Sequence, residues 1–267
     1  MSRSRLDPDL TLAEIDDAVR SQLESSASLY SIDESVLTEL GPDVIVTQDL
    51  CAVCAVDVSS VDDALAALRC DASVVSVDPQ TLDEVLASIR TLGAVAGRED
   101  AAAELARSLR ARVAAVRQAT EGRTRPRVLV LEWTDPPFGP GHWVPDLVEA
   151  AGATALCARR GAASVRLGWD EVTASPADVV VVAPCGFHLD AATAVAIMTL
   201  ADPRLPRGAA VWAIDADAVL VRPGPRIVDG IEALATIFHP GVVPLREELV
   251  RYVGTTSANT NPSRSTT

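Results

Sequence analysis

Hydrophobic residues follow two alternating patterns along this chain. Short, mainly apolar runs are bounded by turn residues, which is typical of buried strands. Between them lie longer stretches in which apolar residues recur every three or four positions, as on one face of a helix. The short runs predict strands over residues 43–46, 73–77, 128–133, 153–157, 178–183 and 209–214. The longer stretches predict helices over residues 9–19, 32–40, 60–69, 143–151, 189–200 and 227–238.

One helical segment is much longer than the others and divides the chain. It extends over residues 81–120, where Thr81 and Glu84 form a predicted capping box and helical spacing continues on both sides of Gly97. Because strands and helices alternate before and after it, we expect an α/β fold with two parallel-sheet lobes joined by a long helix. The predicted parts are an N-terminal lobe at 1–78, the linking helix at 79–122, a C-terminal lobe at 126–240 and a disordered tail at 254–267.

The charge of the chain excludes some classes of function. It has 23 basic and 37 acidic residues, a net charge of −14, and every basic residue is an arginine. A field of this sign disfavours binding to a nucleic-acid backbone, and the sequence has no basic stripe with interleaved aromatic residues. No stretch of the sequence is long and apolar enough for a membrane span, and residues 1–19 lack the apolar core of a signal peptide. As it stands, the sequence predicts a cytoplasmic protein without a nucleic-acid partner.

The residues with unusual chemistry are concentrated in four loops. These loops follow predicted strands, at residues 47–57, 135–142, 184–188 and 215–225. The carboxyl ends of parallel strands lie on one edge of a sheet, and open α/β sheets bind ligands there. Trp133, Trp143 and Trp169 lie in or near these predicted loops, although only 3% of the residues are aromatic. The pattern predicts a cleft for a flat, largely apolar ligand.

Five stretches, taken in order, carry a resemblance to a known family. They are GPDVIVTQDLCAVCAV at 41–56, LEWTDPPFGPGHWVPDLVEAAG at 131–152, GWDEV at 168–172, ADVVVVAPCGF at 177–187 and RPGPRIVDGIEALA at 222–235. The chain resembles the helix-linked substrate-binding proteins of ABC importers for iron-siderophores, haem and cobalamin, in particular the cobalamin-binding branch. The resemblance implies a monomeric, non-catalytic clamp of the periplasmic-binding-protein-like, helical-backbone class. It also implies a corrinoid (cobalamin-like) ligand, no cofactor, and an ABC transporter permease as partner.

The sequence departs from this family in two places. The family's N-terminal strand and its secretion signal or lipid anchor have no counterpart here, so we expect an incomplete first lobe. If translation starts upstream of Met1, the resemblance predicts an extracytoplasmic protein instead of a cytoplasmic one. In addition, Gln48 stands where the cobalamin-binding branch has an aromatic residue.

The resemblance places a set of residues in the ligand cleft. Trp169 matches an aromatic residue that lies against the ligand in the family, and the segment from Pro223 to Arg226 matches its last cleft loop. The two arginines of RPGPR could also bind amides, carboxylates or a phosphate. The candidate ligand-binding residues are Gln48, Cys51, Cys54, Trp133, Pro136, Phe138, His142, Trp143, Trp169, Cys185, Phe187, Arg222 and Arg226.

Cysteine and histidine chemistry leaves other functions open. Cys51 and Cys54 could line the cleft, contact a metal or corrinoid, or form a redox pair. A thioredoxin-type redox pair has its first cysteine at a helix N-terminus, whereas the next predicted helix here begins only at about residue 60. His142 and His188 could ligate cobalt or iron, or bond to loop backbone. One alternative is therefore a cytoplasmic metal- or redox-handling protein that uses Cys51, Cys54 and Cys185. The other is a haem or iron-siderophore binder of the same fold.

Overall fold

The structure, a computed structural model, describes residues 2–4, 10–24, 30–48 and 72–257 of the 267-residue chain. It divides into an N-terminal unit, residues 1–106, and a C-terminal unit, residues 107–267. Both units contain parallel strand pairs together with helices, which confirms the predicted α/β fold. None of the described helices is long and apolar enough to cross a membrane. The predicted helix at 60–69 and the candidates Cys51 and Cys54 lie outside the described residues.

The described residues of the N-terminal unit form two pairs of strands. The first pair is antiparallel and the second is parallel, with Val44 opposite Ser73. The strands are β1 (Ser2–Ser4), β2 (Tyr30–Ile32), β3 (Val44–Thr47) and β4 (Ser73–Ser76). The helices that begin in this unit are α1 (Leu12–Glu24), α2 (Glu34–Leu40), α4 (Leu82–Val95) and α5 (Glu99–Thr120). Helix α2 ends at Gly41, which has the left-handed φ of 48° that favours glycine.

Helices α4 and α5 together form the long helical segment predicted for residues 81–120, which is broken near Gly97. The predicted capping box is confirmed, because the Thr81 hydroxyl accepts the N–H of Glu84 and the Glu84 carboxylate accepts the N–H of Thr81. Gly97 lies between the helices with a φ of 61° and breaks the segment. A Cβ atom at Gly93 would lie 2.2 Å from the Cβ of Ala102, so the two helices approach closely only because residue 93 is glycine.

The C-terminal unit is built on a five-stranded sheet in the order β12-β11-β10-β5-β8. Four of the strands are parallel, and β12 pairs antiparallel with β11. The strands are β5 (Arg127–Leu131), β8 (Thr154–Leu156), β10 (Val179–Val182), β11 (Ala210–Ile214) and β12 (Val250–Thr255). The central strand β10 consists of four buried valines, as expected for a parallel strand covered on both faces. A smaller sheet contains β6 (Trp133–Thr134), β7 (Pro137–Gly139) and β9 (Val165–Arg166).

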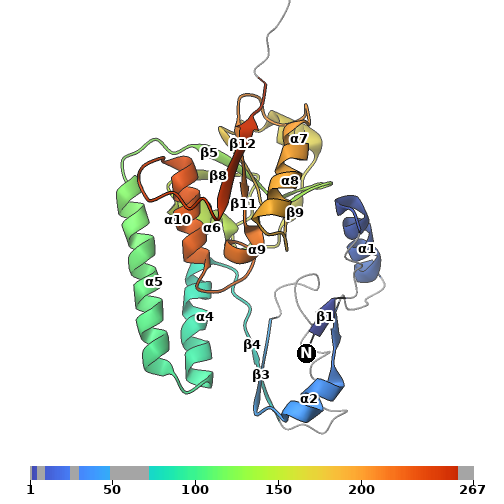
Figure 1. Ribbon diagram of the computed structural model, residues 1–267. Helices are drawn as coiled ribbons and strands as arrows, with labels where there is room; N and C mark the ends of the chain where they lie inside the picture. The colour runs from blue at the N-terminus through green and yellow to red at the C-terminus, as the bar shows by residue number, and fades with distance from the viewer. Residues whose placement is uncertain (1, 5–9, 25–29, 49–71, 258–267) are drawn as a thin grey trace, which may run out of the picture. The chain divides into compact units, whose positions relative to one another are not determined.

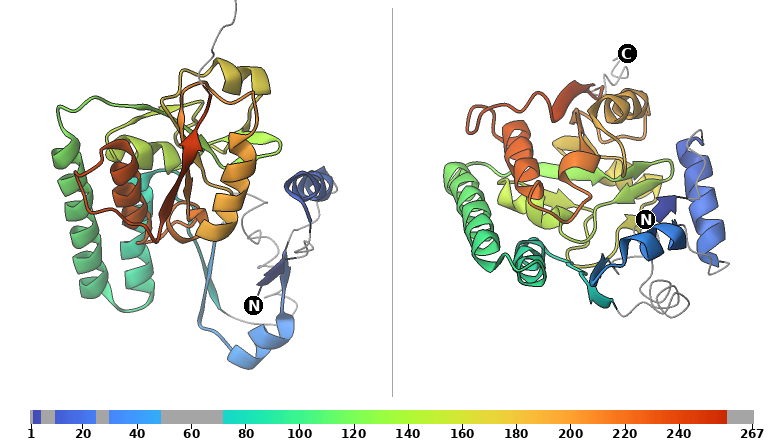
Figure 2. Two further views of the ribbon diagram at one scale, coloured as in Figure 1. Left: turned by 45° about the horizontal axis from the view of Figure 1, so that its top comes forward. Right: turned by 60° about the horizontal axis from the view of Figure 1, so that its bottom comes forward.

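Helices cover both faces of the five-stranded sheet (Figures 1 and 2). They are α6 (Val144–Ala150), α7 (Trp169–Ala174), α8 (Leu189–Leu200), α9 (Ala216–Val219) and α10 (Ile227–Phe238). Helices α6 and α10 pack together on one face, whereas α8 lies on the other face against β11 and β12. The bounds of α8 and α10 are those predicted from the sequence. Gly230 allows α10 to approach α9, because a Cβ there would lie 2.3 Å from the carbonyl oxygen of Val219.

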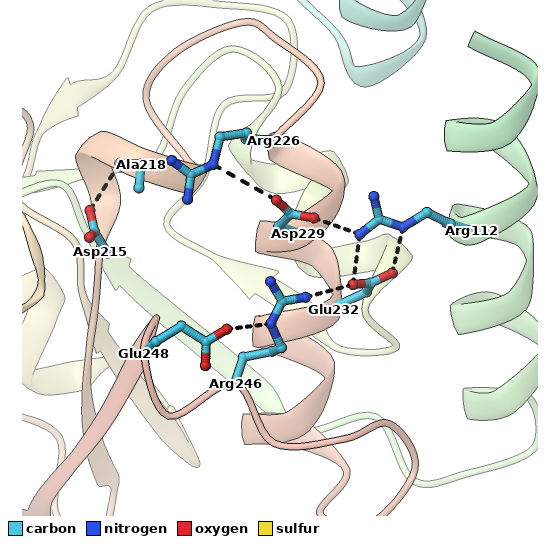
Figure 3. A network of polar contacts seen from close by, with 8 residues as sticks. All are labelled: Arg112, Asp215, Ala218, Arg226, Asp229, Glu232, Arg246 and Glu248. Atoms are coloured by element: carbon cyan, nitrogen blue, oxygen red, sulfur yellow. Dashed lines mark hydrogen bonds and ion pairs between the residues drawn. The ribbon is translucent and has the colours of Figure 1, made fainter. Parts of the chain in front are cut away.

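A chain of ion pairs joins α5, α10 and the segment before β12 (Figure 3). The Arg112 guanidinium donates to Asp229 at 2.6 Å and to both carboxylate oxygens of Glu232 at 2.8 Å. Arg246 lies 3.2 Å from Glu232 and 2.7 Å from Glu248. The side chains of Asp229 and Glu232 are each only 21% exposed, so water weakens these pairs less than it weakens pairs on an open surface. The network fixes three segments that are far apart in the sequence.

The predicted disordered tail at 254–267 is wrong over its first residues. Strand β12 extends to Thr255 and forms an edge of the sheet. Thr256 follows it and is buried, because its hydroxyl donates to the Pro206 carbonyl at 2.6 Å and accepts the N–H of Ala209 at 2.9 Å. The sequence of β12 has no apolar run to reveal it, since polar residues and a glycine interrupt the pattern.

Candidate ligand-binding site

The order of the strands marks a binding position on the C-terminal unit. After β5 the chain forms β8 on one side of β5. It then forms β10 and β11 on the other side of β5. At such a switch point the loops after the two central strands separate and leave a crevice outside the carboxyl ends of the strands. The loops that meet here are those after β5 and β10.

Two aromatic side chains meet at this switch point. Trp133 follows β5 and Phe187 follows β10, and their ring centroids are 5.9 Å apart in an edge-to-face arrangement. Phe138 lies opposite Trp133 across the β6–β7 hairpin. The Trp133 indole N–H donates to the Asp135 carbonyl at 3.1 Å, within the same hairpin. All three rings are half-buried, so they form an apolar surface that remains partly accessible. Pro136 lies half-buried in the turn of the hairpin.

Glu132 lies between the end of β5 and Trp133. The Ser164 hydroxyl donates to Oε2 of Glu132, and the Gly141 N–H donates to the same carboxyl group. Burial raises the pKa of the Glu132 carboxyl to about 7, while these two hydrogen bonds act in the opposite direction. A carboxyl group with a raised pKa therefore directly precedes Trp133 in the chain.

An acidic cluster lies beside the aromatic pair, at the carboxyl end of β11. Nδ1 of His188 is 3.2 Å from Oδ1 of Asp215, and its Nε2 is 3.6 Å from Oδ2 of Asp217. Arg222 donates to Asp217 at 2.7 Å. Asp215 also accepts the N–H of Ala218 at 2.9 Å and so caps α9. In the described part of the chain, no group of three or more His, Cys, Asp or Glu side chains is placed to hold a metal ion.

Trp143 points into the unit rather than toward solvent. Only 2% of it is exposed, and its indole N–H donates to the Leu220 carbonyl at 2.7 Å. The loop after β7 is thereby fixed to the loop after β11. His142 has a φ of 48° and its ring lies 5.8 Å from that of Trp143. Ligand contact by these two residues stays a prediction. In the structure, Trp143 holds two loops of the C-terminal unit together.

The remaining predicted residues make contacts of other kinds. The Trp169 ring stacks on the guanidinium of Arg204, 3.9 Å from its carbon, and that guanidinium donates three hydrogen bonds to the Asp202 carboxylate. Arg226 is exposed at the start of α10, 3.8 Å from Asp229 (Figure 3). Gln48 is half-buried directly after β3 in the N-terminal unit. Contact of these residues with a ligand likewise stays a prediction.

Cys185 is the one predicted cysteine of the site within the described residues. Its side chain is exposed, and its backbone N–H donates to the carbonyl of Glu132 at 3.2 Å. This bond ties the loop after β10 to the end of β5. Cys185 therefore lies at the switch point, next to Glu132.

A sequence model of the periplasmic binding protein family matches residues 31–200, more than half of the chain. The chain belongs to the periplasmic binding protein family. No curated protein sequence matches it. A periplasmic haem-binding protein from Pseudomonas aeruginosa is similar in structure, with a TM-score of 0.62 and 19% identity over 86% of this chain and 83% of its own.

Two further solved structures are similar to this periplasmic binding protein. An ABC transporter substrate-binding protein from Listeria monocytogenes has a TM-score of 0.61 and 14% identity, covering 78% of this chain and 80% of its own. A periplasmic vitamin B12-binding protein from Vibrio cholerae has a TM-score of 0.53 and 20% identity, covering 78% of each chain. At these identities the likeness establishes the fold.

Sequence reasoning did not identify three acidic residues of this periplasmic binding protein's candidate site. Glu132 was visible as a single charge at the end of an apolar strand, where a polar residue must find partners. Asp215 and Asp217 were visible as two acids directly after the apolar strand β11. In each case the signal was a carboxylate at the carboxyl end of a strand, in loops where the aromatic residues and cysteines are the more unusual side chains.

Proposed function

We propose that this periplasmic binding protein is the extracytoplasmic solute receptor of an ABC importer and that it binds a corrinoid. The observation that carries the proposal is the half-buried aromatic pair Trp133–Phe187 at the switch point, beside an acidic cluster. The names of the structural neighbours support the receptor role, since they include an ABC transporter substrate-binding protein and binders of haem and vitamin B12. In this role the protein binds and releases its ligand without catalysis and delivers it to a permease.

The charges around the aromatic pair favour a corrinoid over haem. Haem carries two anionic propionates, which need cationic or N–H partners. Here Asp215 and Asp217 border the site, and the nearby Arg222 is already bonded to Asp217. The rim of a corrin carries amides, which donate hydrogen bonds to carboxylates without adding negative charge. Electrostatic complementarity therefore selects the amide-bearing macrocycle, and like-charge repulsion disfavours the other.

Equilibrium dialysis against cyanocobalamin, read from the corrin absorbance, tests this proposal. We expect binding by the natural chain and a loss of at least about fivefold in affinity for Trp133→Ala, since a stacked aromatic ring contributes on the order of 1 kcal/mol or more. Tyr252→Ala, which removes an exposed aromatic ring on the edge strand β12, is the matched control and should bind normally.

Competition separates the two ligand classes. Haemin should fail to displace cyanocobalamin at equal concentration. If haemin binds more tightly and cyanocobalamin is displaced, the receptor role stands and the corrinoid assignment is wrong. If neither macrocycle binds, the ligand proposal as a whole is wrong.

A further inference from the structure

Arg204 lies in the loop between α8 and β11, and its side chain is held in one orientation. Its guanidinium carbon is 3.9 Å from the centroid of the Trp169 ring. Its Nε donates to both carboxylate oxygens of Asp202, at 2.9 and 3.2 Å, and its Nη2 donates to the same carboxylate at 2.6 Å. The Thr173 hydroxyl is 2.7 Å from the carbonyl oxygens of both Trp169 and Arg204, so the backbone of the loop is tied to α7 as well. The protein therefore occupies one face and one edge of the guanidinium.

The rest of this guanidinium is open to solvent. The Arg204 side chain is 52% exposed, whereas that of Asp202 is 18% exposed. Nη1 of Arg204 carries two N–H groups, and neither donates to any residue in the described part of the chain. A planar group that is already fixed loses little conformational freedom when it binds a partner. Arg204 thus offers a flat surface and two hydrogen-bond donors in a defined position.

The stacked pair lies beside the turn of the β6–β7 hairpin, which contributes to the aromatic surface of the candidate site. The N–H of Leu167, two residues before Trp169, donates to the Pro137 carbonyl in this hairpin at 2.8 Å. Hydrogen bonds to its carboxylate partner raise the pKa of Arg204 most, and the charge of Asp135 in the hairpin turn raises it further. Arg204 is therefore within electrostatic range of the turn.

We infer that Arg204, rather than Trp169, contacts the ligand beside this hairpin, and that Trp169 is a positioning residue that holds the guanidinium in place. The inference rests on the function proposed above. The family resemblance predicts that Trp169 itself lies against the ligand, whereas here a guanidinium covers one face of its ring.

The chemistry of Arg204 complements that of the acidic cluster in the same unit. Asp215 and Asp217 can accept hydrogen bonds, whereas the two Nη1 groups of Arg204 can only donate them. The amides on the rim of a corrin contain both an N–H donor and a carbonyl acceptor, so one ligand can satisfy both groups of side chains. The charge of Arg204 is already compensated by Asp202, so an uncharged carbonyl is a suitable acceptor. The exposed face of the guanidinium can also lie against a conjugated ring.

The test measures cyanocobalamin binding by equilibrium dialysis for Arg204→Ala. We expect its affinity to fall at least about fivefold, because hydrogen bonds to the ligand are lost. Arg204→Lys keeps the charge but neither the plane nor the paired donors, so it should lose most of the same affinity. Arg207→Ala, which removes an exposed arginine of the same loop and changes the net charge equally, is the matched control and should bind normally.

The direction of the Arg204→Ala effect separates the two possible contacts. If Trp169 contacts the ligand directly, removal of the guanidinium uncovers its ring, and affinity should stay the same or rise. That result would overturn the inference. If Trp169 acts through Arg204, Trp169→Leu should weaken binding in the natural protein but cause no further loss in Arg204→Ala.

Nuclear magnetic resonance of the ligand-free protein checks the position of the guanidinium. The Nε–H proton of Arg204, assigned by its absence in Arg204→Lys, should be shifted upfield by the Trp169 ring. This shift should disappear in Trp169→Leu, and addition of cyanocobalamin should move the signal of the natural protein. A signal at the ordinary position in the natural protein would show that the ring does not hold the guanidinium, and the inference would be wrong.

Haemin serves as a second probe that separates this inference from the proposed function. If haemin binds instead of cyanocobalamin and Arg204→Ala weakens it, the corrinoid assignment is wrong and the contact by Arg204 stands. If cyanocobalamin binds the natural protein and Arg204→Ala equally well, the proposed function stands and the inference is wrong. If neither macrocycle binds, both are wrong.

Discussion

Replacement of Trp143 by phenylalanine tests how the two site loops of the C-terminal unit are held. Trp143 is 2% exposed and its indole N–H donates to the Leu220 carbonyl at 2.7 Å, which joins the loop after β7 to the loop after β11. Phenylalanine keeps an aromatic ring in the same place but has no N–H. The substitution removes the bond between the loops while changing the apolar packing little.

The magnitude follows from two contributions. Loss of the hydrogen bond leaves the buried Leu220 carbonyl without this donor, which costs about 1–3 kcal/mol. The smaller ring leaves a gap in the core, which costs about 1 kcal/mol more. The free energy of unfolding of the C-terminal unit should therefore fall by about 2–4 kcal/mol. At about 2–4 °C per kcal/mol for a unit of this size, its Tm should fall by roughly 4–16 °C.

Calorimetry of the natural and substituted proteins measures this change. Trp212→Phe is the matched control, because Trp212 is a half-buried residue of β11 that faces Tyr252 with ring centroids 5.2 Å apart. It should lower the Tm of the unit by a smaller amount. Equal shifts for the two substitutions would refute the reasoning, since the bond between the loops would then contribute nothing beyond the aromatic ring.

Two other substitutions test contacts within the C-terminal unit. One removes Arg112 from the ion-pair network, and the other adds a Cβ atom at Gly230, where α10 approaches α9. Arg112→Ala should destabilise it by about 1–3 kcal/mol in denaturant titrations, because half-buried carboxylates lose a bidentate partner. Arg110→Ala, at an exposed position of the same helix, should change stability by less than about 0.5 kcal/mol, and similar losses for both would contradict the role of the network. Gly230→Ala should cost about 3 kcal/mol or more, because its Cβ would lie 2.3 Å from the Val219 carbonyl oxygen. Gly168→Ala, which meets nothing within 4 Å, should leave the Tm within a few degrees, and an equal effect of both would exclude the close approach as the cause.

The sequence predicts best where the local pattern and the tertiary environment agree. Helices α8 and α10 have the bounds that the apolar spacing predicts, since each has a buried face and a clear turn signal at its ends. The valine run of β10 also predicts its strand, because a strand covered on both faces needs no alternation. Position at the carboxyl end of a parallel strand likewise predicts that Trp133 and Phe187 meet.

The sequence predicts less where a contact depends on a distant partner. Strand β12 is formed by pairing with β11, about forty residues earlier in the chain, and its own residues alternate poorly. Trp143 illustrates a second limit. An aromatic residue in a loop can face a ligand or the core, and its spacing is the same in both cases. Only the Leu220 carbonyl, supplied by another loop, decides its direction.

The charged residues at the carboxyl ends of the strands differ in exposure from those of the ion-pair network around Arg112. In the network, the side chains of Arg112 and its carboxylate partners are all partly buried. At the carboxyl ends of the strands, the side chains of His188 and Arg222 are 73% and 74% exposed, whereas those of Asp215 and Asp217 are 13% and 12% exposed. The acids are therefore fixed in the protein, and the basic side chains over them extend into solvent and can move at low cost. A ligand with hydrogen-bond donors can displace these side chains and bind carboxylates that are already in position, which reduces the entropy lost on binding. An anionic ligand would have to draw the same basic side chains away from their partners and leave two carboxylates beside its own charge. This asymmetry supports the proposal that an amide-bearing corrinoid, rather than haem, binds at this edge of the sheet.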